Sequence, residues 1–238
     1  TGGDGGDGGG TILFGFATYC WAKNVESSGH GPQYGGGCVR FFASFRCEIR
    51  DSYLHSDSTD INNISPGGAY YNIVMDSYCA DNLIENCISW VANKVIVMRG
   101  TGGGNVIAYN YFDDGYGNSY PNQGETGVNA AHMTTSHHEL FEGNWSWNLS
   151  GDARWGNSIY IVFFRNYART MRASAWPGYG VPVQPAIGST SAAYNNPLLT
   201  YSYTDGSGTY YYEDEYNRAG VIVAAFHWNY SFVGNVLG

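Results

Sequence analysis

Seven short segments of this 238-residue chain share one pattern, and that repeat restricts the chain to a small set of architectures. Each segment centres on Asn or Asp, and six of the seven carry a large apolar residue three positions earlier. In chain order the central residues are Asn24, Asp51, Asn86, Asn110, Asn144, Asn166 and Asn235. They are separated by 27, 35, 24, 34, 22 and 69 residues. We therefore take the spacings of 22 and 24 residues as the basic unit and the longer ones as that unit with insertions.

Such a unit is long enough for three short strands and three turns, which make one complete coil of a parallel β-solenoid. Successive coils would then stack at about 4.8 Å, the ordinary distance between neighbouring strands. At a bend that recurs in every coil, Asn satisfies backbone groups that the bend leaves unpaired, and it tolerates a left-handed backbone. We therefore predict that the seven central residues form a structural ladder along an all-β solenoid.

The composition agrees with this fold and argues against a nucleic-acid partner and against a membrane span. The chain holds 34 Gly and 21 Tyr, which is typical of a turn-rich β protein, and no window has a sustained helical period. Its formal net charge is −9 and its 11 basic residues are scattered, so we expect no nucleic-acid partner. No apolar run approaches twenty residues, so we expect no membrane span.

The segments NLIENCI, NVIAYNYFDD, LFEGN, FFRNY and FVGNVLG resemble the right-handed parallel β-helix superfamily of pectate-lyase-like proteins. More narrowly, they resemble a group of uncharacterised secreted bacterial β-helix proteins. The resemblance covers most of residues 72–170 and 221–238, and it implies a single-stranded right-handed parallel β-helix in a secreted or cell-surface, extracellular protein. The superfamily contains lyases, hydrolases, tailspikes and adhesins. No catalytic signature of a characterised member is matched, so the resemblance assigns no catalytic residue.

The repeat also suggests a domain organisation. We interpret residues 1–10 as a Gly-rich arm and residues 11–238 as one β-helix domain with a long insertion at about 171–219. Three further coils would fit the same interval numerically, although a folded-over loop fits its composition better. The arm matches half of a calcium-binding β-roll repeat but lacks a second repeat, so a flexible linker is the simpler interpretation.

Five cysteines, with spacings that match no zinc pattern, are better explained by thiols or disulfides than by a metal site. Cys20 and Cys47 both stand four residues before their central residues, so stacking would place them on adjacent coils. A disulfide bond and a pair of buried thiols both remain open at this stage.

Two insertions, at 113–130 and 148–158, fall in consecutive coils and are expected to wall a groove along the solenoid. The candidate catalytic residues there are Asp113, Asp114, His132, His138, Glu142, Asp152 and Arg154, and the candidate sugar-stacking residues are Tyr116, Trp145, Trp147 and Trp155. Two carboxylates would serve glycoside hydrolysis. A His or Arg could instead take the C5 proton of a uronic acid for β-elimination. No cofactor is expected with certainty, and Ca²⁺ enters only if the protein is a lyase.

Each candidate also has a structural interpretation. Asp113 and Asp114 stand where Asp commonly forms a turn. His137 and His138 are adjacent and would point to opposite faces of a strand, so no metal site is predicted. Glu142 occupies a register position that is apolar in other coils, which marks either a functional site or an exposed face.

Two functions remain open on this basis. The first is a secreted polysaccharide-binding or polysaccharide-degrading β-helix protein of lyase or glycosidase type, with polysaccharide as its partner. The alternative is a non-catalytic structural or adhesive β-helix, such as an extracellular filament, surface or tailspike-like subunit. The chain ends on a repeat segment without a polar cap, so we also expect self-association through the solenoid ends or the Gly-rich arm.

Overall fold

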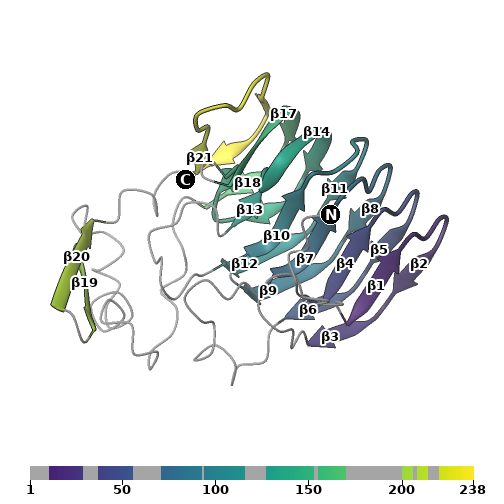
Figure 1. Cartoon of the computed structure of the whole chain (residues 1–238), viewed down its shortest axis with the longest axis horizontal. Coiled ribbons are helices and arrows are strands. Elements are labelled where there is room, and N and C mark those ends of the chain that lie inside the picture. Colours follow the sequence, from purple (N-terminus) through teal and green to yellow (C-terminus); the bar gives the residue numbers. More distant parts are fainter. Residues whose placement is uncertain are drawn as a thin grey trace.

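The structure, a computed structural model, describes residues 11–28, 37–55, 71–92, 94–115, 127–152, 155–169, 200–205, 208–213 and 220–238. Within these residues the protein is all-β and contains no helix. Three parallel sheets of seven strands each make up the body of the molecule (Figure 1). No helix in these ranges is long and apolar enough to cross a membrane.

Among the strands of these three sheets, each sheet takes every third strand in chain order. Sheet 1 contains β1 (Ile12–Gly15), β4 (Val39–Phe42), β7 (Tyr71–Asp76), β10 (Lys94–Arg99), β13 (Val128–Asn129), β16 (Leu149–Ser150) and β21 (Val221–Ile222). Sheet 2 contains β2 (Trp21–Lys23), β5 (Glu48–Arg50), β8 (Leu83–Glu85), β11 (Val106–Ala108), β14 (Met133–Glu142), β17 (Gly156–Phe164) and β22 (Ser231–Val233). Sheet 3 contains β3 (Glu26–Ser28), β6 (Tyr53–His55), β9 (Ile88–Ala92), β12 (Tyr111–Gly115), β15 (Trp145–Ser146), β18 (Tyr167–Ala168) and β23 (Val236–Leu237).

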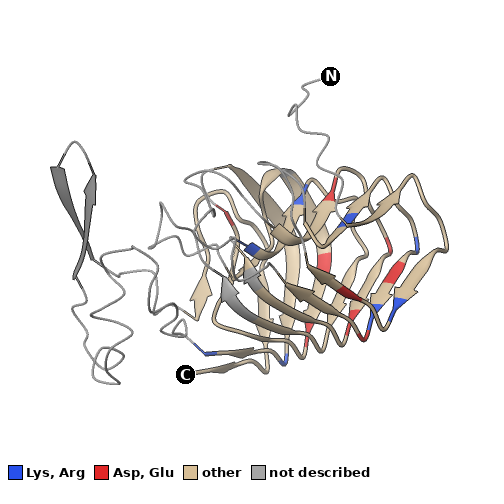
Figure 2. Cartoon of the chain, turned by 90° about the horizontal axis from the view of Figure 1, so that it is seen from below, with Lys and Arg blue, Asp and Glu red and all other residues tan. Residues whose placement is uncertain are grey.

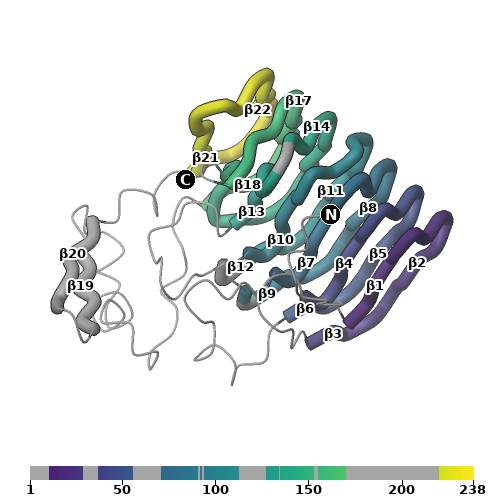
Figure 3. The backbone as a smooth tube through the Cα atoms, viewed as in Figure 1, coloured from purple at the N-terminus to yellow at the C-terminus, as the bar shows by residue number. Residues whose placement is uncertain are grey.

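We call three consecutive strands, one from each sheet, a triplet; β1, β2 and β3 are the first. Every strand pairs in parallel with the equivalent strands of the neighbouring triplets, an arrangement compatible with a parallel β-helix. Figure 3 shows the triplets succeeding one another in chain order, from purple to yellow. Two further strands, β19 (Thr200–Asp205) and β20 (Gly208–Glu213), form a separate antiparallel pair inside the predicted insertion at 171–219. The predicted arm at 1–10 lies outside the described residues.

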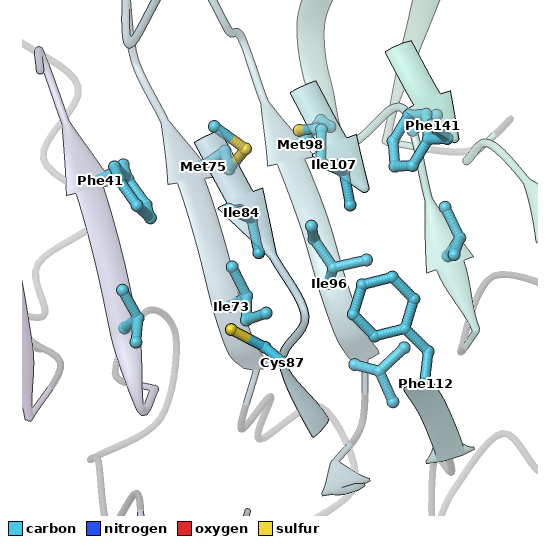
Figure 4. Close-up of a cluster of buried hydrophobic side chains, with 14 of the residues drawn as sticks. Phe41, Ile73, Met75, Ile84, Cys87, Ile96, Met98, Ile107, Phe112 and Phe141 are labelled. Atoms are coloured by element: carbon cyan, nitrogen blue, oxygen red, sulfur yellow. The ribbon is translucent and has the colours of Figure 1, made fainter. Parts of the chain in front are cut away.

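Rows of apolar side chains at equal register fill the core (Figure 4). In sheet 2 one row runs through Ile107, Phe141, Phe163 and Phe232, and the ring centroids of Phe141 and Phe163 are 4.9 Å apart. In sheet 1 Met75 and Met98 are paired partners and are fully buried. Burying one such side chain stabilises the fold by about 1.5–3 kcal/mol, so the regular spacing of apolar residues is the main source of stability.

Two columns of left-handed residues mark the corners between the sheets. The corner between sheets 1 and 2 has positive φ at Tyr19, Arg46, Asp81, Gly104, His138, Tyr160 and Asn229. The corner between sheets 2 and 3 has positive φ at Asn24, Asp51, Asn86, Tyr109, Gly143, Arg165 and Gly234. A left-handed residue other than Gly costs about 1–2 kcal/mol, so each corner needs compensating contacts.

Ladders of asparagine side chains provide those contacts. The ladder at the corner between sheets 2 and 3 corrects the predicted row of seven central residues. Asn110, Asn144, Asn166 and Asn235 follow their left-handed residues directly. The Oδ1 atom of Asn144 accepts the backbone N–H of Asn110 at 3.0 Å and its side-chain amide at 2.9 Å, and Asn166 does the same for Asn144. The Nδ2 atom of Asn144 also donates to the carbonyl of Ile107 at 2.8 Å.

Asn24, Asp51 and Asn86 do not belong to this ladder, contrary to the prediction. They stand one residue earlier, at the left-handed position itself, and Asn86 donates to Asp51 on the exposed side at 2.6 Å. The ladder position in their triplets is held by Val25, Ser52 and Cys87, and Cys87 N–H donates to Asn110 at 2.8 Å. Asn suits both positions, so the repeat of Asn alone could not distinguish them.

A second ladder lines the corner between sheets 1 and 2. Asn82 Oδ1 accepts the N–H of Cys47 at 2.9 Å, and Asn105 Oδ1 accepts the N–H of Asn82 at 3.0 Å. Glu139 takes the same position in the next triplet and accepts the N–H of Asn105 at 3.1 Å. Thr101 also donates its hydroxyl to Glu139. The corner between sheets 1 and 2 is therefore stabilised in the same way as the corner between sheets 2 and 3, with a buried carboxylate in place of one amide.

Charged residues of both signs occur close together in the strands of the first triplets (Figure 2). Arg50 lies 2.5 Å from Glu85, and Lys23 lies 3.1 Å from Asp51. These pairs are partly exposed, so each contributes at most about 1 kcal/mol.

Candidate functional site

His132 and Asp152, from neighbouring triplets, meet beside sheet 1. His132 directly precedes β14 and its N–H donates to the carbonyl of Met98 at 2.7 Å. Asp152 follows β16 and its N–H donates to the carbonyl of Ala131 at 2.9 Å. These backbone bonds bring the His132 Nδ1 and Asp152 Oδ2 atoms to 2.5 Å. The other carboxylate oxygen of Asp152 accepts the N–H of Trp155 at 2.9 Å.

The Asp152 carboxylate is fully buried, whereas the His132 side chain keeps 14% of its surface exposed. A carboxylate at Nδ1 holds the proton on that nitrogen, which leaves the Nε2 lone pair to accept a proton. Nε2 lies 3.5 Å from the Tyr71 hydroxyl, and the two rings meet edge to face with centroids 5.9 Å apart. This arrangement can transfer a proton at Nε2.

Two cationic side chains of β10 contact the neighbours of this pair. The Lys94 Nζ atom lies 5.8 Å from the centre of the Tyr71 ring. Arg99 Nε contacts Met133 Sδ at 3.1 Å, next to His132 in the chain. The guanidinium of Arg99 also lies 3.7 Å from Asp76. Lys94 and Arg99 are both buried, so their positive charges act in a medium that screens them less than water does.

His227 supports Asp152 from the last triplet. Its Nε2 atom lies 3.1 Å from the Asp152 carbonyl, and its Nδ1 atom accepts the N–H of Ala224 at 3.3 Å. Burial lowers the pKa of His227, which favours the neutral ring that these two bonds require. The ring stacks on Tyr230, whose centroid is 5.0 Å away. Burial raises the pKa of Tyr230 to about 12, so its hydroxyl stays protonated and bonds Ser158.

Of the predicted catalytic residues, only His132 and Asp152 are brought together among the described side chains. Asp113 and Asp114 lie in β12, and their side chains are outside the described part of the structure, as are Arg154 and Tyr116. Their predicted roles remain predictions.

Glu142 was predicted to be out of register with the other coils, but it is not. It pairs with Ala108, which pairs with Glu85, and Glu85 pairs with Arg50, so this row faces outward and is charged in the first triplets. The apparent anomaly came from the one-residue error in the ladder alignment. The Glu142 carboxylate accepts the Tyr109 hydroxyl at 3.1 Å, on sheet 2 and away from the His132–Asp152 contacts.

His138 lies within β14 and has other partners than His132. It adopts a φ of 54° and its ring stacks on Tyr160, with centroids 4.8 Å apart. The left-handed backbone turns His138 toward His137, so their Nδ1 atoms are 3.0 Å apart and do not point to opposite faces. The described residues contain no group of three or more His, Cys, Asp or Glu that could hold a metal ion.

The predicted aromatic platforms differ in what they expose. Trp147 is only 1% exposed and cannot stack on a sugar, so that prediction is wrong. Trp145 lies between Tyr111 and Tyr167, with centroids at 4.5 and 6.1 Å, and both faces of its ring are covered. Trp155 is 57% exposed beside Asp152, so it keeps a surface for a ligand.

Four residues of this site were missed in the sequence: Tyr71, Lys94, Arg99 and His227. Arg99 ends a strand whose other residues are almost all apolar, directly after the buried Met98. Asp76 stands at the same position after Met75, so charged residues at the ends of two aligned strands were a usable signal. Nothing comparable marked Tyr71 or His227.

No protein-family model, curated protein or solved structure matches this chain. The functional argument therefore rests on the geometry of the site and on the physical chemistry of its residues.

Proposed function

We propose that the protein is a secreted, right-handed parallel β-helix that binds and cleaves an acidic polysaccharide along the outer side of sheet 1. The observation that carries this proposal is the His132–Asp152 contact of 2.5 Å, with Nε2 directed at the Tyr71 hydroxyl. A buried carboxylate that orients an imidazole is a common arrangement for general base catalysis.

The reaction is β-elimination at a uronic acid residue. Nε2 of His132 removes the C5 proton, the electron pair forms the C4–C5 double bond, and the bond from C4 to the glycosidic oxygen breaks. The Tyr71 hydroxyl donates a proton to the departing oxygen. Its distance of 3.5 Å from Nε2 lets the two groups act on neighbouring atoms of one sugar ring.

The buried cations supply the second requirement of this chemistry. Removal of the C5 proton moves negative charge onto the sugar carboxylate, and a fixed positive charge beside it lowers the barrier. From β10, Lys94 lies beside the Tyr71 ring, and Arg99 contacts Met133, the next residue after His132 in the chain. Ca²⁺ would assist by binding the same carboxylate from solution, and no resident cofactor is required.

A non-catalytic structural or adhesive role is the second candidate. The observation that favours it is the ion-paired row of sheet 1, in which Asp76 lies 2.7 Å from Arg40 and 3.7 Å from Arg99. Charges that neutralise one another in this way are compensated within the fold and do not require a ligand. Self-association through the solenoid ends or the Gly-rich arm belongs to this candidate.

Incubation with a panel of neutral and uronic-acid polysaccharides, with and without calcium, tests the two candidates. Elimination predicts new reducing ends together with the ultraviolet absorbance of an unsaturated sugar, and His132→Ala should lower both by about 10²–10⁴-fold. His55→Gln is the matched control, because His55 contacts Glu26 at 3.2 Å on sheet 3.

Reducing ends without the absorbance would identify a hydrolase and overturn the elimination step. If the panel gives no product and shows no polysaccharide binding, the enzymatic function is overturned and the structural candidate is favoured.

A further inference from the structure

Cys20 and Cys47 occupy the same position in the first two triplets. Trp21 pairs with Glu48, and the N–H of Glu48 donates to the carbonyl of Cys20 at 2.9 Å, so the two cysteines lie side by side just before β2 and β5. Neighbouring strands are about 4.8 Å apart. Disulfide-bonded cysteines have Cα atoms roughly 4.4–6.8 Å apart, so this register suits a disulfide bond.

The side-chain directions agree with the register. At this corner each ladder side chain reaches back to the preceding triplet, as Asn82 does to the N–H of Cys47 at 2.9 Å. The Cys47 thiol reaches back in the same way and lies 3.4 Å from the carbonyl of Ala17, in the first triplet. Burial raises the pKa of Cys47, and both the backbone N–H and the thiol of Cys20 also act on it. The shared register position and the direction of the Cys47 thiol toward the first triplet thus bring the two cysteines together.

The other three cysteines have no cysteine at the same register position. The pairings of their neighbours place Cys38 beside Asn72, Cys79 beside Ser44 and Cys87 beside Ser52. All three are buried, whereas Cys20 is exposed. Only one pair in this chain therefore combines correct spacing with access for an oxidant.

We propose that Cys20 and Cys47, which are free thiols in the structure, form a disulfide bond that fastens the first triplet to the second when the protein meets a disulfide oxidant. With glutathione disulfide, the Cys20 thiolate attacks one sulfur atom and releases one glutathione thiolate. The Cys47 thiolate then attacks the Cys20 sulfur and releases the second. Two electrons pass from the protein to glutathione, and the two thiol protons go to the released glutathione thiolates.

Thiol counting in the native protein tests the bond directly. Reduced protein is incubated with glutathione disulfide, unreacted thiols are alkylated in denaturant, and the peptides are identified by mass spectrometry. The expected result is a fall from five thiols to three, with a cross-linked peptide that joins Cys20 to Cys47. Cys47→Ser should form no intramolecular bond, and the matched control Cys87→Ser should still form it.

Hydrogen exchange supplies a second measurement on the unmutated protein. The amides of β2 and β3 should exchange several-fold more slowly in the oxidised than in the reduced protein, because the bond suppresses separation of the first triplet. The proposal is overturned if five thiols persist, if only a glutathione adduct forms on Cys20, or if the cross-link joins another pair. It is also overturned if the bond forms and this exchange is unchanged.

Discussion

Glu139 accepts hydrogen bonds from both the backbone N–H and the side-chain amide of Asn105, at 3.1 and 3.2 Å. A carboxylate thus continues a ladder that Asn82 and Asn105 build with amides. Because Glu139 is fully enclosed, burial raises its pKa from 4.5 to about 7, against the opposing effect of its hydrogen bonds.

This pKa predicts a pH dependence of stability. A carboxyl group that binds its proton more tightly in the folded state stabilises the fold fully below pH 4.5 and loses that contribution as the pH rises to about 7. The loss amounts to about 3 kcal/mol at 1.36 kcal/mol per pKa unit. Glu139→Gln keeps the acceptor and removes the charge, so its unfolding free energy should decline less between pH 5 and 8. Urea unfolding at several pH values measures this, and parallel curves for the two proteins would contradict it.

The ladder of the other corner predicts a large effect from one amide. Asn144→Ala removes the acceptor for two donors of Asn110 and the donor to Ile107, all buried, and should cost roughly 3–5 kcal/mol. Asn86→Gly is the control, because Asn86 stands at an exposed position with a φ of 52° that Gly adopts readily. Its cost should stay below about 1 kcal/mol. Equal costs in chemical denaturation would contradict the distinction between the two positions.

Asp152 should control activity by keeping the proton of His132 on its Nδ1 atom. Asp152→Asn offers Nδ1 an amide in place of a carboxylate, so Nε2 no longer reliably holds the free lone pair. We expect kcat to fall by about 10²–10⁴-fold with a smaller change in KM. A fall in affinity without a fall in kcat would show that Asp152 serves binding alone. Circular dichroism should confirm that the variant retains its β structure.

The two exposed-side tryptophans should behave differently toward a glycan. Trp155→Ala should weaken polysaccharide binding by about 5- to 20-fold, because its ring is exposed next to Asp152. Trp145→Ala should leave binding unchanged and lower stability, because its faces already contact Tyr111 and Tyr167. Isothermal titration with the best substrate compares them, and equal losses would remove the reason for separating their roles.

Much of the fold could be predicted from the repeat, because a parallel stack forces equivalent residues into rows. The large apolar residues three positions before Asn144, Asn166 and Asn235 are Phe141, Phe163 and Phe232, and they lie in one row. The register of the first three triplets was wrong by one residue, because Asn serves both a left-handed corner and a ladder. The backbone angle at Asn86, which the sequence does not carry, is what separates the two uses.

The site was less predictable because its contacts join distant parts of the chain. His132, His138 and Asp152 were all candidates. Nothing in the sequence indicated that Asp152 would contact His132 rather than His138. Tyr71 reaches His132 across 61 positions of sequence, a contact that depends on the relative twist of strands and on side-chain direction. Such details follow from packing and have no local signal.

The ladders have a direction, and it matters during synthesis. Asn110 finds its acceptor on Asn144, and Asn144 finds its acceptor on Asn166, so each triplet is completed by the one that follows it in the chain. On the ribosome, a newly emerged triplet therefore holds corner amides that lack their protein acceptor until its successor arrives. The protein should fold as a moving front, with only its most recent triplet incomplete at any moment.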